Sequence, residues 1–505
     1  MASVLPTHEN LSEDKHVESL LFPCLDEGST PSSSTKIFTI MKPTFIPTYV
    51  VIGFIITGFI VTAFKTAPEQ AIRSPRENYL QYCAGCHGEQ HERFAARAWV
   101  YGNSLKEVTA TLKHGRPAIG MPEFAKAMND TEIRELAEYT IREVAQVPKI
   151  IPSEFNVNEK VQSLDLTFKL EEVASGMNIP WGMGFLPDGS MLVTEKTGKL
   201  FHIKNGKQSE ITGVPKTVVR GQGGLMEVLV HPEFKKNKLI YLSFADGDTP
   251  DKINTTIIRA VLKNGKLSRI QKIFHANPDT NSGSHFGCRM FFDKDGYLFF
   301  SIGERGRKEN AQDLTNHCGK IHRIYEDGRI PADNPFVNTA GAMPTIWSYG
   351  HRNPQGLYYE KATNTIWENE HGPKGGDELN IVRKGLNYGW PVISFGINYD
   401  GTVFTNDTAR VGMEQPFHYW TPSIGPSSLT MVTSDKYPAW KGDFMSGSLS
   451  FEYLERTLIK NNRVVGRERL MPKIGRIRNV VQGPDGYLYI AVEKIGKVFK
   501  IVPVQ

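Results

Sequence analysis

Short apolar segments that follow Asp-Gly turns recur through the last two thirds of this chain. Residues 191–195, 297–303 and 487–492 each begin within two residues of an Asp-Gly pair. Asp-Gly beside alternating apolar residues is the typical signal of a β-hairpin. Its repetition across residues 165–505 predicts an all-β propeller of about six four-stranded blades, with two packed sandwiches as the alternative.

The length and charge of the chain restrict what else it can be. At 505 residues it is too long for a single ordinary core, so several domains are expected. The formal net charge is only +5. No long Lys/Arg block accompanies it, so we expect no nucleic-acid partner.

An uncharged run, residues 43–64, lies between Lys42 and Lys65 near the start of the chain. It approaches the ~20 residues that span the hydrocarbon core of a bilayer. We therefore expect a transmembrane signal anchor there. A cleaved signal peptide starting at Met41 is the alternative. The preceding residues 1–42 would be a polar tail or an over-extended reading of the start.

The motif Cys83-Ala-Gly-Cys86-His87 follows this run. C-x-x-C-H is the attachment signature of a c-type haem, in which Cys83 and Cys86 bond the porphyrin and His87 ligates the iron. The motif therefore predicts haem c and the transfer of single electrons. Covalent haem attachment in bacteria occurs outside the cytoplasmic membrane, which agrees with an exported chain.

Helical patterns surround the motif and predict a small all-α domain over residues 72–147. Residues 76–82 form a short helix that delivers the thiols. A second helix opens at Asn129, with Glu132 at the capping-box position. Apolar residues then keep a three-to-four spacing along it, at Ile133, Leu136, Ala137, Thr140, Ile141 and Val144.

Between these helices lies Gly120-Met121-Pro122-Glu-Phe124. It resembles the sixth-ligand loop of the small class I cytochromes c. The resemblance implies His87 and Met121 as axial ligands, with Met128 and His114 as alternatives to Met121. A thioether opposite an imidazole raises the haem potential, which suits an electron acceptor.

The composition of the chain changes after the helices. Residues 148–164 contain prolines and charged residues without periodicity, which predicts a linker. Further on, Cys288 and Cys318 could form a disulfide in an oxidising compartment, or could be two buried free thiols.

Ordered motifs in residues 165–505 resemble one family, the soluble pyrroloquinoline-quinone (PQQ) dependent sugar dehydrogenases, which are six-bladed propellers. The motifs include Gly221-Gln-Gly-Gly-Leu225, His285-Phe-Gly287, Tyr349-Gly-His-Arg352-Asn353-Pro354, Glu370-His-Gly372-Pro373, Gly376-Asp-Glu378-Leu-Asn380, Asn387-Tyr-Gly-Trp-Pro391 and Arg476-Ile-Arg478. Each motif alone is weak evidence for the family, whereas the order in which the motifs occur is specific to it.

The resemblance implies roles for single residues. His285 matches the general base, and an imidazole titrates in the range that proton removal needs. Arg352, Asn353, Arg476 and Arg478 match residues that bind the cofactor, whose three carboxylates call for arginine. Arg352 would also stabilise the charge that grows on the quinone oxygen. Gln222 matches a polar contact with the substrate.

Calcium is the metal that this resemblance implies. The carbonyls of Gly372 and Pro373 match ligands of a calcium ion beside the quinone. Glu378 and the Tyr388 carbonyl match part of a second, structural calcium site.

Two positions depart from the family pattern. Ser450 stands where well-known members carry a lysine that contacts a cofactor carboxylate. Ser284 stands where glucose-oxidising members carry an acidic residue that binds the sugar.

Together these observations predict a quinohaemoprotein on the periplasmic side of the bacterial inner membrane, anchored or soluble. It would oxidise a sugar or polyol at PQQ and pass electrons through haem c to a cytochrome, a copper protein or the respiratory chain. The alternatives are a non-catalytic sensor or binding propeller with a cytochrome relay, and a calcium-dependent, lactonase-like hydrolase.

Overall fold

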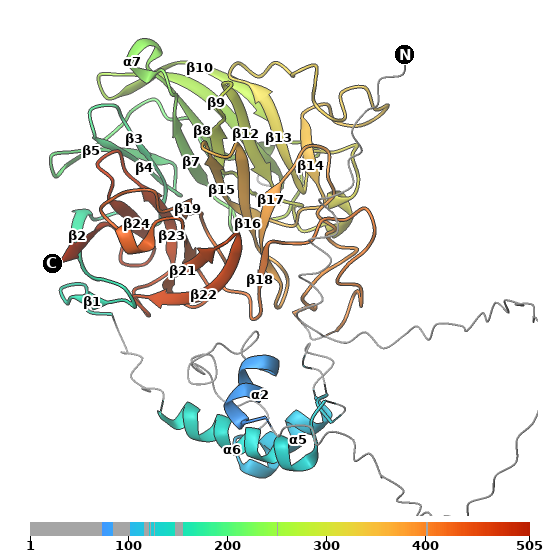
Figure 1. The fold of residues 1–505 in the computed structure, drawn as a ribbon. Coiled ribbons are helices and arrows are strands. Elements are labelled where there is room, and N and C mark those ends of the chain that lie inside the picture. The colour runs from blue at the N-terminus through green and yellow to red at the C-terminus, as the bar shows by residue number, and fades with distance from the viewer. Residues whose placement is uncertain are drawn as a thin grey trace, which may run out of the picture.

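The computed structural model describes residues 73–83, 102–115, 121, 123–125, 127–146, 155–249, 251–399 and 402–504. These residues form a small helical part and a large β part, coloured from blue to red along the chain in Figure 1. The two parts are described separately below.

The helical part contains α2 (Pro75–Tyr82), α5 (Leu105–His114) and α6 (Asp130–Gln146). The helix predicted over residues 76–82 and the helix predicted after Asn129 are confirmed. The predicted capping box is also present, since the Asn129 side chain accepts from the Glu132 amide at 3.0 Å and Glu132 accepts from the Asn129 amide at 2.9 Å. Helix α5 was not predicted.

One apolar cluster holds the helical part together. It buries Tyr79 and Cys83 at the end of α2, Leu112 on α5 and Leu136 on α6, and Met121 packs against it. Cys83, predicted to bond the porphyrin, and Met121, predicted to be an axial ligand, therefore border the same core. Alternative ligand His114 is exposed at the end of α5, whereas Met128 is buried in the cluster.

The β part is a six-bladed propeller, which confirms the predicted fold and excludes two packed sandwiches. Every blade is an antiparallel sheet, and in five of the six blades the strands follow one another in sequence. The first three blades contain β3 (Pro180–Phe185), β4 (Met191–Glu195), β5 (Lys199–Lys204) and β6 (Lys207–Glu210); β7 (Leu225–Val230), β8 (Leu239–Thr249), β9 (Lys252–Lys263) and β10 (Lys266–His275); and β11 (Met290–Phe292), β12 (Tyr297–Ile302), β13 (Lys320–Tyr325) and β14 (Ile346–Tyr349).

The other three blades complete the ring. They contain β15 (Pro354–Glu360), β16 (Thr365–Glu370), β17 (Asp377–Val382) and β18 (His418–Trp420); β19 (Thr430–Met431), β20 (Phe444–Ser448), β21 (Tyr453–Lys460) and β22 (Arg463–Leu470); and β23 (Ile477–Gln482), β24 (Leu488–Val492), β25 (Lys497–Val504), β2 (Thr167–Ala174) and β1 (Val161–Gln162). Short helices α7 (Phe234–Asn237), η2 (Lys308–Ala311) and η3 (Pro438–Trp440) lie in the connections.

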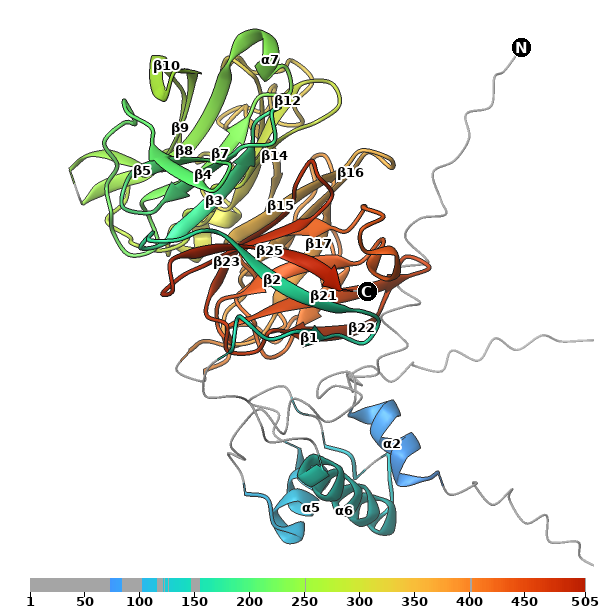
Figure 2. The same cartoon turned by 90° about the vertical axis from the view of Figure 1, so that its left-hand side faces the viewer.

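The ring closes where the two ends of the β part meet. Strand β2 pairs with the last strand, β25, from Thr167 opposite Val504 to Ala174 opposite Val498, and Figure 2 shows the two side by side. The short strand β1, which lies within the predicted linker 148–164, extends this sheet at its edge. Hydrogen bonding between first and last strands thus completes the ring.

The Asp-Gly turns explain why the strands begin where they do. Gly189, Gly296 and Gly486 have φ angles of 82°, 82° and 83°, a region that favours glycine. The chain can therefore reverse tightly at these positions. The apolar segments predicted after the turns are confirmed as β4, β12 and β24.

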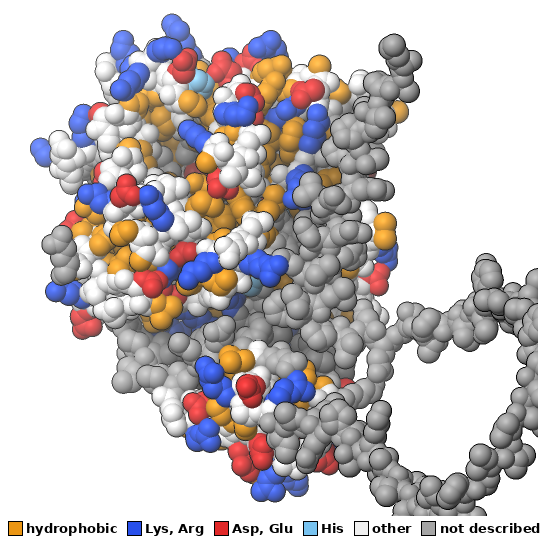
Figure 3. Space-filling view, viewed as in Figure 1, with side chains coloured by type: hydrophobic (Ala, Val, Ile, Leu, Met, Phe, Trp, Pro, Cys, Tyr) orange, Lys and Arg blue, Asp and Glu red, His pale blue; other side chains and the backbone are white. Residues whose placement is uncertain are grey.

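Several other expectations concern the termini, cysteines and charge. No helix among the described residues is long and apolar enough to cross a membrane, and the predicted anchor, residues 43–64, lies outside them. Cys288 and Cys318 are both buried free thiols, so the disulfide alternative is wrong. On the face drawn in Figure 3, basic and acidic side chains are interspersed over the propeller.

Candidate active site

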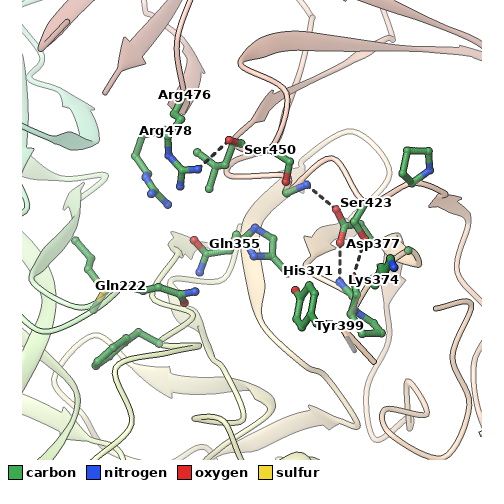
Figure 4. Close-up of a pocket in the computed structure, with 18 of the residues that line it drawn as sticks. Gln222, Gln355, His371, Lys374, Asp377, Tyr399, Ser423, Ser450, Arg476 and Arg478 are labelled. Carbon is green, nitrogen blue, oxygen red and sulfur yellow. Dashed lines mark hydrogen bonds between the residues drawn. The ribbon is translucent and has the colours of Figure 1, made fainter. Parts of the chain in front are cut away.

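A cavity of about 390 Å³ opens where residues from all around the ring converge (Figure 4). Its wall includes Trp181 on β3, Met226 on β7, Gln355 on β15 and Arg478 on β23. Predicted site residues Gln222, Gly372, Pro373, Arg476 and Arg478 also line it, together with Phe286, His371, Lys374, Gly375, Asp377, Tyr399, Pro422, Ser423, Gly425, Leu449 and Ser450. The structure therefore brings together residues predicted from motifs far apart in sequence.

One wall of the cavity is strongly basic. Arg476 and Arg478 flank Ile477 at the start of β23 and lie side by side in Figure 4. Both guanidinium groups pair with Glu493, with Arg476 Nε at 2.9 Å from Oε2 and Arg478 Nε at 2.5 Å from Oε1. Burial alone would raise the pKa of Glu493, but the two arginines hold it below the usual value. One carboxylate thus orients two cations.

A third cation, Lys196, lies near this basic wall and was not predicted from the sequence. Its ammonium group donates to the Gly221 carbonyl at 2.5 Å, beside Gln222. Burial lowers the pKa of Lys196, and the charge of Arg478 lowers it further. No motif includes Lys196, which follows the ordinary strand β4, so only the folded ring reveals its place.

His285, the predicted base, is held by a carboxylate. Its Nδ1 lies 2.7 Å from Glu304 Oε1, and Glu304 is 3% exposed. Burial lowers the pKa of His285, and the charge of Arg352 lowers it further. The hydrogen bond to Glu304 raises this pKa and so opposes both effects. An Nδ1–H donated to Glu304 leaves Nε2 as the basic nitrogen. No role was predicted for Glu304 from the sequence.

The backbone around His285 is tightly constrained. His285 has a φ of 55°, which is uncommon outside glycine, and its amide donates to Gln222 Oε1 at 2.7 Å. A Cβ at Gly303 would lie 2.3 Å from the His285 carbonyl oxygen, so only glycine fits there. Predicted substrate residue Gln222 therefore also positions His285.

Arg352 and Asn353 lie behind the cavity wall rather than in it. Arg352 Nη1 donates to the Gly372 carbonyl at 2.7 Å and to the His371 carbonyl at 3.1 Å. Asn353 Nδ2 lies 3.4 Å from His371 Nδ1, and Asn353 Oδ1 accepts from the Gly287 amide at 3.2 Å. Both residues thus connect the His285 segment with the His371–Pro373 segment.

The carbonyls predicted to bind calcium already have hydrogen-bond donors. Arg352 donates to Gly372, and Ser423 Oγ donates to the Pro373 carbonyl at 3.0 Å. Each carbonyl oxygen has a second lone pair, so the segment can still offer two oxygens to a hard cation. Asp377 lies beside them, accepting from the Gly372 amide at 2.8 Å, and burial raises its pKa to about 7.

The residues predicted for a second calcium ion lie nearby. Glu378 is the second residue of β17 and is partly buried. Burial raises the pKa of Glu378 well above the usual value, as does the charge of Glu370. Tyr388 is buried, and its ring stacks on His351 with the centroids 4.6 Å apart.

The two departures from the family pattern are located at the site. Ser450 lines the cavity beside Leu449, whose carbonyl accepts from Arg476 at 2.8 Å. Ser284 is partly buried, and its carbonyl accepts a hydrogen bond from Arg305. Predicted haem residues Cys86 and His87 lie outside the described residues.

Comparison with known proteins agrees with this geometry. Residues 177–500 match the family model described as "Glucose / Sorbosone dehydrogenase". Residues 70–139 match the model described as "Cytochrome C oxidase, cbb3-type, subunit III", which supports a cytochrome c domain before the propeller.

Individual relatives cover the propeller almost completely. The aldose sugar dehydrogenase YliI of Escherichia coli (strain K12) is 38% identical over 346 residues, which are 67% of this chain and 93% of that protein. A crystal structure titled glucose dehydrogenase superposes with a TM-score of 0.65 at 40% identity, covering 67% of this chain and all of that one. The PQQ-bound aldose sugar dehydrogenase of Streptomyces coelicolor superposes with a TM-score of 0.56 at 25% identity, covering 69% and 99%.

Fold and site thus define a sugar dehydrogenase propeller, with oxidoreductase chemistry of the PQQ type, joined to a cytochrome c domain. The chain belongs to the glucose/sorbosone dehydrogenase family, the soluble PQQ-type glucose and aldose sugar dehydrogenases.

Proposed function

We propose that this protein oxidises a hydroxyl group of a sugar or another polyol at bound PQQ and passes the electrons to its own haem c. The observation that carries the proposal is the pair formed by His285 and Glu304, 2.7 Å apart. Phe286, the next residue, and Gln222, which accepts from the His285 amide, both line the arginine-containing cavity. A partly buried histidine oriented by a carboxylate is suited to accept a proton.

The cavity fits a planar tricarboxylate. Arg476 and Arg478 line the cavity, and Lys196 lies close enough to Arg478 for that charge to lower its pKa. Lys196 would therefore replace the family lysine that is absent at the position of Ser450. Among the described residues, buried nitrogens Arg352 Nε and Trp181 Nε1 have no hydrogen-bond partner, and the guanidinium of Arg478 lies over the Trp181 ring. When bound, PQQ supplies the acceptor for the hydride of the substrate.

His285 would remove the hydroxyl proton of the substrate at Nε2. The lowered pKa keeps its imidazole neutral and ready to accept a proton near neutrality. Glu304 would then stabilise the imidazolium. Arg352 holds the His371–Pro373 segment in place and offers positive charge to an oxygen that becomes negative during reaction.

A calcium ion beside the quinone fits the donors of this segment. The carbonyls of Gly372 and Pro373, with the buried Asp377 carboxylate adjacent, are the oxygen ligands that calcium prefers. Calcium would increase the polarisation of the bound carbonyl group.

We further propose that Cys83 and Cys86 attach the haem, with His87 and Met121 as axial ligands. Cys83 and Met121 border one apolar core, as a haem pocket requires. Covalent connection keeps this one-electron acceptor at high effective concentration beside a two-electron donor. Residues 43–64 would hold the protein at the periplasmic side of a bacterial inner membrane, where a cytochrome, a copper protein or the respiratory chain takes the electrons.

Optical titration tests the proposal. The full chain, carrying haem and supplied with calcium and PQQ, is mixed with aldoses and polyols, and the haem spectrum is followed. We expect haem reduction with at least one of them, and loss of that reduction in His285→Asn. The matched control is His202→Asn, since His202 lies on β5 and pairs with Ser190. Absence of haem reduction with every substrate would refute the proposal.

A further inference from the structure

We propose a further metal site in the propeller, formed by His351, Glu368 and Glu370, which binds a divalent transition-metal ion such as Zn²⁺ or Mn²⁺. One ligand atom of each residue lies within 4.8 Å of the others. The ligands differ from Glu378 and Tyr388, which match the family's structural calcium site. The proposal is independent of quinone binding.

Strand register explains why these side chains meet. Glu368 and Glu370 are two residues apart on β16 and therefore share a face of the sheet. On β17, Asn380 pairs with Glu368 and Glu378 pairs with Glu370, so that face carries three carboxylates. His351, from the loop after β14, adds its imidazole, with Nδ1 at 3.4 Å from Glu370 Oε1.

The cluster is buried and lacks a compensating cation. Exposure is 0% for His351, 0% for Glu368 and 3% for Glu370. Among the ion pairs of the described residues, no Lys or Arg side chain pairs with Glu368, Glu370 or Glu378, and Glu368 Oε1 has no hydrogen-bond partner among those residues. Buried carboxylates are costly unless they are paired or coordinate a metal. A bound cation would supply the missing charge.

The donor types select the class of metal. Calcium and magnesium prefer oxygen ligands alone, whereas imidazole suits zinc and other first-row transition ions. One histidine with two carboxylates therefore favours Zn²⁺ or Mn²⁺ over Ca²⁺.

Neighbouring side chains orient the ligands as in metal sites. Ser348 Oγ lies 2.9 Å from His351 Nε2. If the Nε2–H group donates a hydrogen bond to Ser348, the lone pair on Nδ1 is free for a metal. Asn380 Nδ2 donates to Glu368 Oε2 at 3.1 Å. The stacked ring of Tyr388 fixes the plane of the imidazole.

The site would also stabilise the loop that carries Arg352. Glu370 Oε2 accepts from the Arg352 amide at 2.5 Å and from the Asn353 amide at 3.1 Å. Glu370 would thus use one oxygen for the metal and the other for the backbone of two active-site residues. The ion would act as a positioning element rather than in catalysis.

Metal analysis of the purified full chain tests the site. Protein exchanged into metal-free buffer is offered Zn²⁺ or Mn²⁺, dialysed, and analysed by mass spectrometry for metal per haem. We expect one ion per chain in the wild type. In Glu368→Gln, affinity should fall by more than the roughly 10–100-fold that loss of an outer-shell partner costs. The matched control is Glu455→Gln, since Glu455 is equally buried but pairs with Arg467; it should keep the ion.

Pulsed electron paramagnetic resonance of the Mn²⁺-loaded wild type gives a second measurement that needs no folded variant. Histidine ligation by His351 should appear as ¹⁴N modulation on the Mn²⁺ signal. Absence of this modulation, retention of the ion by Glu368→Gln, or a chain that holds only Ca²⁺ would each overturn the proposal, and the cluster would then share a proton instead. None of these results depends on PQQ or on haem reduction.

Discussion

Two charged clusters of the propeller are unbalanced in opposite senses: one has more cations than carboxylates, and the other has more carboxylates than cations. At the start of β23, cations Arg476, Arg478 and Lys196 surround the single carboxylate of Glu493. On β16, the carboxylates of Glu368 and Glu370 lie together with the imidazole of His351, and Glu378 on β17 is the strand partner of Glu370. Each cluster therefore has an excess of one sign of charge, in a place where water screens charge poorly.

The sign of the excess indicates the class of ligand. A cluster with surplus cations facing a cavity is completed by an anion, here the carboxylates of a quinone. A closed cluster with surplus carboxylates is completed by a cation. The two clusters thus teach that unbalanced buried charge is informative about what binds, because it is costly without its partner.

Removal of Arg478 should give the largest effect. Truncating one partner of a buried charge pair costs about 2–5 kcal/mol, so Arg478→Met should weaken PQQ binding roughly 30- to 5000-fold. Titration of the calcium-loaded full chain with PQQ measures this. Arg323→Met is the control, because Arg323 is also buried but pairs with Asp333 on another blade. Equal PQQ affinity in Arg478→Met and the wild type would contradict the proposal that the cationic cluster binds an anion.

The carboxylate beside His285 should act on rate and pH dependence together. Glu304→Gln should lower kcat by about 100-fold, because the imidazolium loses its partner. Protonated His285 cannot accept a proton, so activity is lost as pH falls through its pKa. Burial already lowers that pKa and Glu304 opposes the shift, so the variant's acid limb should move to lower pH.

The pH profile of kcat/KM, with Glu304→Asp as the conservative control, checks this prediction. A fall in kcat without movement of the acid limb would assign Glu304 a merely structural role.

The same substitution should have opposite effects on stability in the two clusters. In metal-free protein, Glu493→Gln breaks the pairing with Arg476 and Arg478 and should destabilise the propeller by about 3 kcal/mol. Glu368→Gln removes an uncompensated buried charge and should be neutral or stabilising by about 1 kcal/mol. Denaturant unfolding of both variants in one chelator-treated buffer compares them. Destabilisation of similar size in both would remove the distinction between the clusters.

Lys196 should give the smallest effect. Lys196→Met should weaken PQQ binding by about tenfold, because its ammonium is one of three cations and lies at the edge of the wall. Lys199→Met, an exposed lysine paired with Glu210, is the control and should leave affinity unchanged. If Lys196→Met also leaves affinity unchanged, the replacement for the family lysine lies elsewhere.

The sequence predicted whatever depends on local signals or ordered motifs. The Asp-Gly turns fix the positions of β4, β12 and β24, and the capping box of Asn129 and Glu132 fixes the start of α6. Motifs around Gln222, Gly372 and Arg478 identified residues that do converge on one cavity.

Long-range placement could not be predicted in the same way. Lys196 follows an ordinary strand, and only ring closure brings it to β23. Glu368 alternates along β16 like any strand residue, and its lack of a counter-charge depends on β17 and His351. Helix α5 has a capping box at Ser104 and Glu107, a local signal that could have revealed it.

Ring closure has a mechanical consequence. The strand that enters the propeller from the N-terminal side, β2, belongs to the same sheet as β23, which carries the arginines. Just before β2, Asp165 forms an ion pair of 2.5 Å with Arg456, and the Leu164 amide donates to Glu468 at 2.6 Å. Tension applied through the preceding residues would load the pairing of β1 with β2 and then these two contacts before it reached β23 and its arginines.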